Sequence, residues 1–139
     1  MTDTLVDTDI LSELLRGRNA QVADRAKERI ARTGPLAISA VTLMELATGL
    51  EKAKRIHELD TYLARLRPLK VLKFTADEAR LAGTICGALE RTGVTIGRAD
   101  PMIAATALVH DLTLVTGNVG HYERVRTLGH PLRIENWRD

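Results

Sequence analysis

Cysteine, aromatic residues and long apolar runs are all scarce in this sequence. Its 139 residues include one cysteine, Cys86, which excludes an internal disulfide and fits a reducing, cytoplasmic compartment. Aromatic residues make up 3% of the chain, so the core has to be built from Leu, Ile, Val and Ala. No run of about 18 apolar residues occurs, and the first residues lack the basic and apolar stretches of a signal peptide. We therefore expect neither a membrane span nor secretion.

The length and charge fit one ordinary globular domain. A chain of 139 residues can bury enough surface to fold without disulfides or structural zinc, so we expect residues 1–139 to form one domain. The formal net charge is +2, which is mildly basic and does not by itself indicate a nucleic-acid partner.

Short apolar segments alternate with segments of helical periodicity along the whole chain. The expected strands are residues 5–6, 36–38, 69–74, 113–116 and 132–134. The expected helices are residues 9–17, 20–33, 41–50, 55–66, 76–91 and 102–109. This alternation predicts an α/β fold with a central, mostly parallel sheet of four to five strands and helices on both faces. Ligands bind beyond the carboxyl ends of such strands, which points here to the loop after Asp7 and the loop after Thr116.

Three carboxylates stand where folding alone does not demand them. Asp7 ends the first strand, where it could also cap the next helix. Glu45 projects roughly opposite the apolar stripe of helix 41–50, as a solvated residue or as the wall of a cleft. Asp100 precedes Pro101 at the start of the most apolar helix, as its N-cap or as an anion stabilised there by the helix dipole.

Together, these acids predict a divalent-metal site. Clustered carboxylates repel one another, and one would gain a proton unless a cation neutralised the group. Magnesium prefers oxygen ligands, takes few carboxylates and completes its shell with water and substrate phosphate. Such an ion polarises a phosphoryl oxygen and activates a water, so phosphodiester hydrolysis is the expected reaction.

The motifs around the three acids resemble those of PIN-domain toxins of the VapC type. The match covers LVDTDILSEL at 5–14, ISAVTLMEL at 38–46 and DPMIAATA at 100–107. LVTGN at 114–118 and LRIENW at 132–137 are similar to the family's C-terminal signature.

This resemblance implies a three-layer sandwich and a cytosolic endoribonuclease dependent on Mg²⁺ or Mn²⁺. It also implies a homodimer, silenced by a cognate antitoxin that is encoded beside it. Carried over position by position, the metal-binding acids are Asp7, Glu45 and Asp100. The polar positions lining the same pocket are Thr8, Thr116 and Asn118.

One position departs from the family pattern. Many members carry a fourth acid three residues after the asparagine, where this chain has His121. A neutral histidine suits manganese or zinc better than magnesium, or the residue lies on the surface with no ligand role. A second metal ion should therefore bind weakly here.

RNA would be held mainly through its phosphates, because so few aromatic residues are available for base stacking. The candidate basic residues follow the first two motifs, although solvated helix faces explain many of them equally well: Arg16, Arg18, Arg25, Arg29, Lys52, Lys54 and Arg55.

Two other functions remain open from the sequence. Asp7-Thr8-Asp9 after a strand is similar to the nucleophile motif of haloacid-dehalogenase-type phosphatases, but no Lys follows Lys73 to hold a phosphoryl group. A non-catalytic PIN-fold module that binds RNA or protein is the second alternative, with His121 as a sign of lost activity.

Overall fold

The computed structural model describes all residues, 1–139, and has one five-stranded sheet at its centre. All neighbouring strands are parallel, and their spatial order is β3-β2-β1-β4-β5. The strands are β1 (Thr4–Val6), β2 (Leu36–Ser39), β3 (Leu69–Leu72), β4 (Thr113–Val115) and β5 (Arg133–Glu135). The predicted parallel α/β fold is confirmed.

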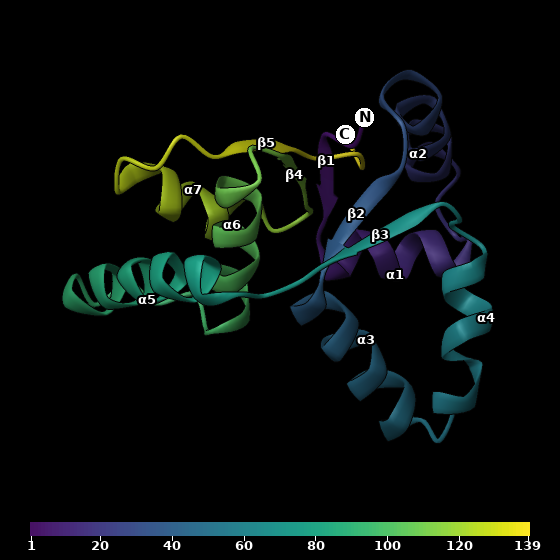
Figure 1. Ribbon diagram of the computed structural model, residues 1–139, viewed down its shortest axis with the longest axis horizontal. Helices are drawn as coiled ribbons and strands as arrows, with labels where there is room; N and C mark the ends of the chain where they lie inside the picture. Colours follow the sequence, from purple (N-terminus) through teal and green to yellow (C-terminus); the bar gives the residue numbers. More distant parts are fainter.

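Seven α-helices and one short 3-10 helix surround the sheet (Figure 1). The helices are α1 (Thr8–Arg16), α2 (Ala20–Thr33), α3 (Ala40–Lys52), η1 (Ile56–Glu58), α4 (Leu59–Ala64), α5 (Ala76–Arg91), α6 (Ala99–Val109) and α7 (Val119–Thr127). None of them combines the length and apolar character that crossing a membrane requires.

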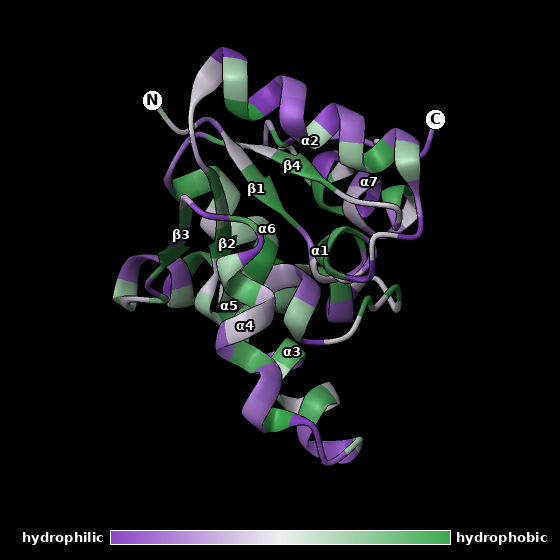
Figure 2. Ribbon diagram, turned by 90° about the vertical axis from the view of Figure 1, so that its right-hand side faces the viewer, coloured by the Kyte–Doolittle hydropathy of each residue, from purple (hydrophilic) through white to green (hydrophobic).

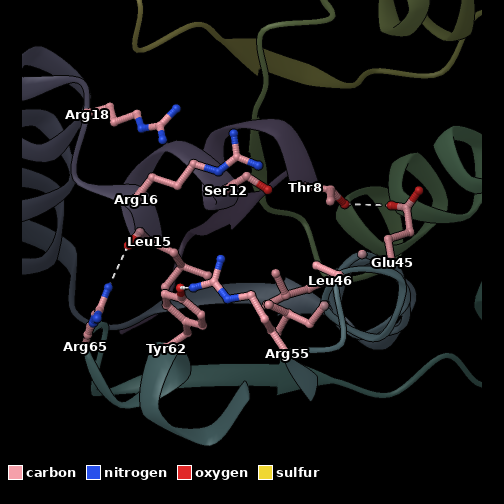
Figure 3. Close-up of a pocket in the computed structure, with 13 residues that line it drawn as sticks. Thr8, Ser12, Leu15, Arg16, Arg18, Glu45, Leu46, Arg55, Tyr62 and Arg65 are labelled. Atoms are coloured by element: carbon pink, nitrogen blue, oxygen red, sulfur yellow. Dashed lines mark hydrogen bonds between the residues drawn. The ribbon is translucent and has the colours of Figure 1, made fainter. Parts of the chain in front are cut away.

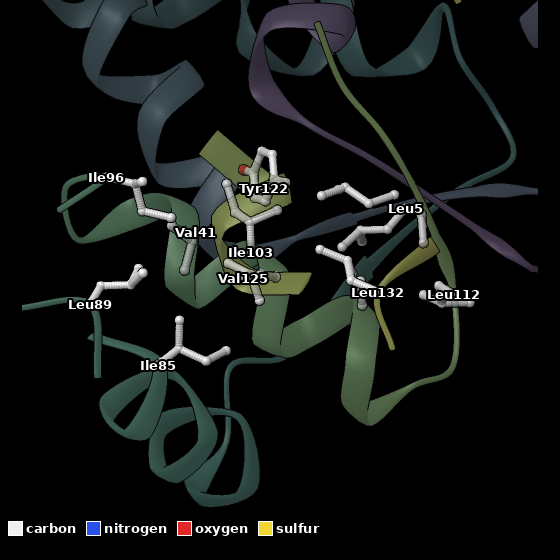
Figure 4. Close-up of a cluster of buried hydrophobic side chains, with 14 residues drawn as sticks. Leu5, Val41, Ile85, Leu89, Ile96, Ile103, Leu112, Tyr122, Val125 and Leu132 are labelled. Atoms are coloured by element: carbon white, nitrogen blue, oxygen red, sulfur yellow. The ribbon is translucent and has the colours of Figure 1, made fainter. Parts of the chain in front are cut away.

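The strands alternate between two hydrophobic clusters, one on each face of the sheet. Leu5 and Leu114 belong to a cluster shared with α5, α6 and α7 (Figure 4). Val6 and Val115, their neighbours in the sequence, belong to a cluster shared with α1 and α2. Figure 2 shows the strands in hydrophobic colours and α2 with long hydrophilic stretches, as expected for an outer helix. The layers are therefore helix, sheet and helix.

Three differences from the predicted elements go beyond a shift of one or two residues at an end. The single helix predicted over 55–66 is wrong, because η1 and α4 divide that segment after a turn at Lys54, whose φ is +58°. Asp100 is not an N-cap, since α6 begins at Ala99 with Arg98 before it. Helix α7 was missed altogether; Gly120 and its polar residues obscured the apolar spacing of Tyr122 and Val125.

Candidate active site

The carboxyl ends of β1 and β4 form the floor of the candidate site. These adjacent strands lead into connections on opposite sides of the sheet, and such a switch point is where parallel sheets bind ligands. Asp7 follows β1 directly, and its backbone N–H donates to the carbonyl of Val115 at 2.9 Å. Thr116 follows β4, and its hydroxyl donates to Asp7 Oδ2 at 2.8 Å. Strand pairing thus joins two predicted site residues that are far apart in the sequence.

Asp7 is a buried carboxylate, 3% exposed, that no cationic side chain contacts. Its Oδ1 accepts a hydrogen bond from the backbone N–H of Thr8 at 2.8 Å, so Asp7 also caps α1 as expected. Burial raises the pKa of Asp7 to about 6, and the negative charges of Asp9 and Asp100 add to that rise. The hydrogen bonds from Thr116 and Thr8 lower the pKa of Asp7 without cancelling the effect of burial.

Glu45 reaches the site from α3 and is held through Thr8. The hydroxyl of Thr8 donates to Glu45 Oε1 at 2.6 Å, and the buried Thr42 hydroxyl lies 3.2 Å from the same Thr8 oxygen. Glu45 is half-buried and makes no ion pair. Of the two interpretations of Glu45, the wall of a cleft is the one seen, since a groove between α1 and α3 is lined by Thr8 and Glu45.

Asp100 lies in the first turn of α6, with its side chain 19% exposed. His121 of α7 bonds to it, with 2.9 Å between Nδ1 and Asp100 Oδ2. His121 is 47% exposed, so it is a surface residue that nevertheless contacts a predicted metal ligand. Asn118 is also exposed; its backbone N–H, rather than its side chain, donates to Thr116 Oγ1.

The three acids do not form one compact cluster. In the conformation seen, no three acidic, histidine or cysteine side chains lie close enough together to hold an ion. The prediction that the three carboxylates converge is therefore wrong for this conformation. Asp7 and Asp100 are near enough for each charge to disfavour the other. Glu45 is instead hydrogen-bonded to Thr8. Asp100 is hydrogen-bonded to His121.

The donor set nevertheless suits a hard divalent cation. The groups at the site are carboxylate and hydroxyl oxygens, which magnesium and manganese prefer, and no cysteine is near. A buried anion without a cationic partner is costly, and a bound divalent ion would offset that cost at Asp7. The residues that could hold such an ion are Asp7, Asp100, whose charge acts on Asp7, and Glu45, which Thr8 holds beside them.

A groove of about 420 Å³ leads away from Thr8 and Glu45 between α1, α3 and α4 (Figure 3). Four arginines line it: Arg16, Arg18, Arg55 and Arg65. Figure 3 shows Arg16 and Arg55 in the middle of the view, and Arg18 and Arg65 on the side of Leu15, away from Glu45. Tyr62 lies between Arg55 and Arg65, with their guanidinium groups 5.7 and 4.7 Å from its ring centre. The groove is therefore basic beside the acidic site.

Some of the predicted RNA-binding residues line this groove, and others make different contacts. Arg16, Arg18 and Arg55 line the groove, whereas Lys52 and Lys54 do not. The prediction that Arg29 contacts phosphate is wrong, because the side chain is buried. It donates to Thr4 and Glu135 and lies over the ring of Trp137. Arg25 donates instead to the carbonyl of Asp139.

Sequence reasoning missed two residues of the site. Arg65 lies far from the motifs in the sequence, and only the return of α4 towards α1 brings it to the groove, where it donates to the Leu15 carbonyl at 2.9 Å. Tyr122 of α7 is fully buried, and its ring belongs to the same cluster as Leu5 (Figure 4). Burial raises the pKa of Tyr122, and the charges of Asp7 and Asp100 raise it further.

Comparison with known proteins agrees with this geometry. The PIN domain family matches residues 4–126. Ribonuclease VapC10 of Mycobacterium tuberculosis is 41% identical over 96% of this chain and 96% of its own length. The tRNA(fMet)-specific endonuclease VapC of Shigella flexneri is 33% identical over 99% of both chains.

Solved structures of toxin–antitoxin complexes have the same fold. A chain in the crystal structure of VapBC2 from Rickettsia felis, bound to a promoter DNA fragment, has a TM-score of 0.82, 29% identity and 99% coverage of both chains. DNA-bound VapBC from Salmonella typhimurium gives the same values. The family match over residues 4–126 argues against the haloacid-dehalogenase-type phosphatase alternative. The chain thus belongs to the PIN-domain family, in its group of VapC-type ribonucleases from toxin–antitoxin systems.

Proposed function

We propose that this chain cleaves RNA phosphodiester bonds with a divalent ion held by Asp7, Glu45 and Asp100, as the toxin of a type II toxin–antitoxin pair. The observation that carries the proposal is the buried Asp7 carboxylate at the strand switch point, which has no cationic partner in the chain. The names of the relatives support hydrolysis of RNA as the reaction.

Hydrogen bonds hold each of the three acids in a different way. Asp7 is fixed from both sides by Thr8 N–H and the Thr116 hydroxyl, so one carboxylate stays in place while the others adjust. Thr8 orients Glu45, and His121 orients Asp100. A bound divalent ion supplies Lewis-acid polarisation of the phosphoryl oxygen and a lowered pKa for the attacking water.

The oxygen donors favour Mg²⁺ or Mn²⁺ as the ion. Magnesium keeps several waters and needs only one or two carboxylates, which fits a site where Asp7 is fixed and two acids are adjustable. A second ion should bind weakly, because His121 replaces a charged oxygen ligand and its Nδ1 is already engaged by Asp100. The residues present would therefore hold one ion more tightly than a second.

The arginine groove is suited to hold the RNA backbone next to the scissile bond. Arg16 and Arg18 are exposed and make no ion pair, so their charges are available to phosphates. The groove ends at Thr8 and Glu45, which would place a bound strand against the acids. Four cations and one aromatic ring favour phosphate contacts over base stacking.

The remaining proposals concern the partners of the chain. The titles of the similar structures name complexes of toxin with antitoxin, which supports a cognate antitoxin for this chain. We infer that an antitoxin segment covers the groove and offers a basic side chain to the acids. We also infer a homodimer, because Met44 of α3 and Val71 of β3 are 60% and 43% exposed.

Cleavage of bulk RNA by the purified chain tests the proposal. Wild type should cut with Mg²⁺ or Mn²⁺ and stop with a chelator, and Asp7→Asn and Asp100→Asn should be inactive. Asp24→Asn is the matched control, since Asp24 is exposed on α2, away from the site. A wild type that never cleaves with either metal would favour the non-catalytic binding module instead.

A further inference from the structure

The hydroxyl of Tyr122 is a polar group buried without a hydrogen-bond partner. The residue is 0% exposed, and its oxygen is one of four buried side-chain polar atoms without a partner. The ring packs in an apolar cluster with Leu5, Val41 and Ile103, where a phenylalanine ring would fill the same space (Figure 4). Packing therefore explains the ring and leaves the hydroxyl unexplained.

Tyr122 lies in the part of the fold that carries both acids, because its ring shares a cluster with Leu5, two residues before Asp7, and with Ile103, three residues after Asp100. Burial raises the pKa of Tyr122, and the charges of Asp7 and Asp100 raise it further. A phenol is protonated at neutral pH even without such neighbours, so the group can act there as a hydrogen-bond donor. Its geometry towards either acid falls short of a hydrogen bond in the conformation seen.

Asp100 is the better acceptor of the two. Both oxygens of Asp7 already accept hydrogen bonds, from Thr8 N–H and the Thr116 hydroxyl. Asp100 accepts only through Oδ2, from His121, and its Oδ1 accepts no hydrogen bond. His121 and Tyr122 are consecutive residues of α7, so the helix that holds the partner of Asp100 also carries the tyrosine.

We propose that Tyr122 is a positioning residue for the metal site: its O–H would donate to Asp100 and hold that carboxylate in an orientation in which it could bind a divalent ion together with Asp7. The inference rests on the proposed function, because it assigns Tyr122 a role towards the ion. Hydrogen bonds to ligating carboxylates fix their orientation, and loss of such partners typically weakens metal binding by about 10- to 100-fold. A buried hydroxyl without a partner costs free energy, and a donor role towards Asp100 would account for its presence here.

Metal affinity of the Tyr122→Phe variant tests the proposal without any RNA. Mn²⁺ titration calorimetry should give a Kd raised about tenfold or more over wild type. Tyr62→Phe is the matched control, because Tyr62 is the only other tyrosine and lies in the arginine groove; its Kd should equal that of wild type. The metal-free Tyr122→Phe protein should be at least as stable as wild type, since it loses only an unpaired hydroxyl.

A second readout follows the phenol directly. Adding Mg²⁺ should change the ultraviolet absorbance of tyrosine in wild type and in Tyr62→Phe, and leave it unchanged in Tyr122→Phe. A Kd of Tyr122→Phe within about twofold of wild type would overturn the inference while leaving the metal site intact. Absence of any Mn²⁺ binding by wild type would overturn the proposed function as well, so the two failures are distinguishable.

Discussion

Replacing Asp7 with Asn should stabilise the metal-free protein at neutral pH while abolishing catalysis. The folded chain raises the pKa of Asp7 from 3.8 to about 6, a shift of about two units that corresponds to about 3 kcal/mol. An asparagine carries no charge to bury, but it cannot accept from Thr116 and Thr8 together as the carboxylate does. Losing one such bond costs about 1 kcal/mol, which leaves a net gain of about 1–2 kcal/mol.

The sign of this effect depends on pH. Between about pH 4 and 6 the folded chain binds more protons at Asp7 than the unfolded chain, so the free energy of unfolding falls as the pH rises. The advantage of Asp7→Asn should therefore be full above about pH 7 and disappear below about pH 4, where Asp7 is protonated in both states.

Urea unfolding with a chelator, at pH 7.5 and at pH 4, measures this difference. Asp24→Asn, an exposed acid on α2, should show no comparable gain. A pH-independent difference, or an Asp7→Asn protein less stable than wild type at pH 7.5, would refute the reasoning from burial.

Three further predictions concern the surroundings of the acids. His121→Ala should weaken Mn²⁺ binding by about tenfold, because Asp100 loses its 2.9 Å partner, and His57→Ala should not; equal affinities would place His121 outside the site. Arg16→Gln should lower the slope of log affinity for single-stranded RNA against log salt concentration by about 0.7, and Arg91→Gln on α5 should leave it unchanged. Light scattering on the purified chain should give the mass of a dimer, and a monomer at micromolar concentration would count against the homodimer.

Much of the fold could be predicted because its strands are short, apolar and buried on both faces. Leu36 and Ile38 are both 0% exposed, and a strand covered on both sides shows up as an unbroken apolar run. Helix α7 could not be read in the same way. It contains Gly120 and only two buried residues, Tyr122 and Val125, so packing against the core decides its conformation rather than its own periodicity.

The candidate site could be predicted in its residues but not in its arrangement. Asp7 and Thr116 follow strands, and the carboxyl edge of a parallel sheet brings such positions together. The direction of a side chain depends on partners far away in the sequence, as Thr8 is for Glu45 and His121 for Asp100. A buried tyrosine such as Tyr122 looks like core in any sequence, and only its unpaired oxygen marks it out.

Binding of Mn²⁺ to the purified chain, measured by calorimetry, tests the central claim most directly. Wild type should bind one ion tightly, and Asp7→Asn and Asp100→Asn should each lose most of that affinity while remaining folded. Glu45→Gln should lose less, because Glu45 is held at the edge of the site by Thr8. No binding by wild type, or equal binding by Asp7→Asn, would contradict the assignment of these acids as the metal site.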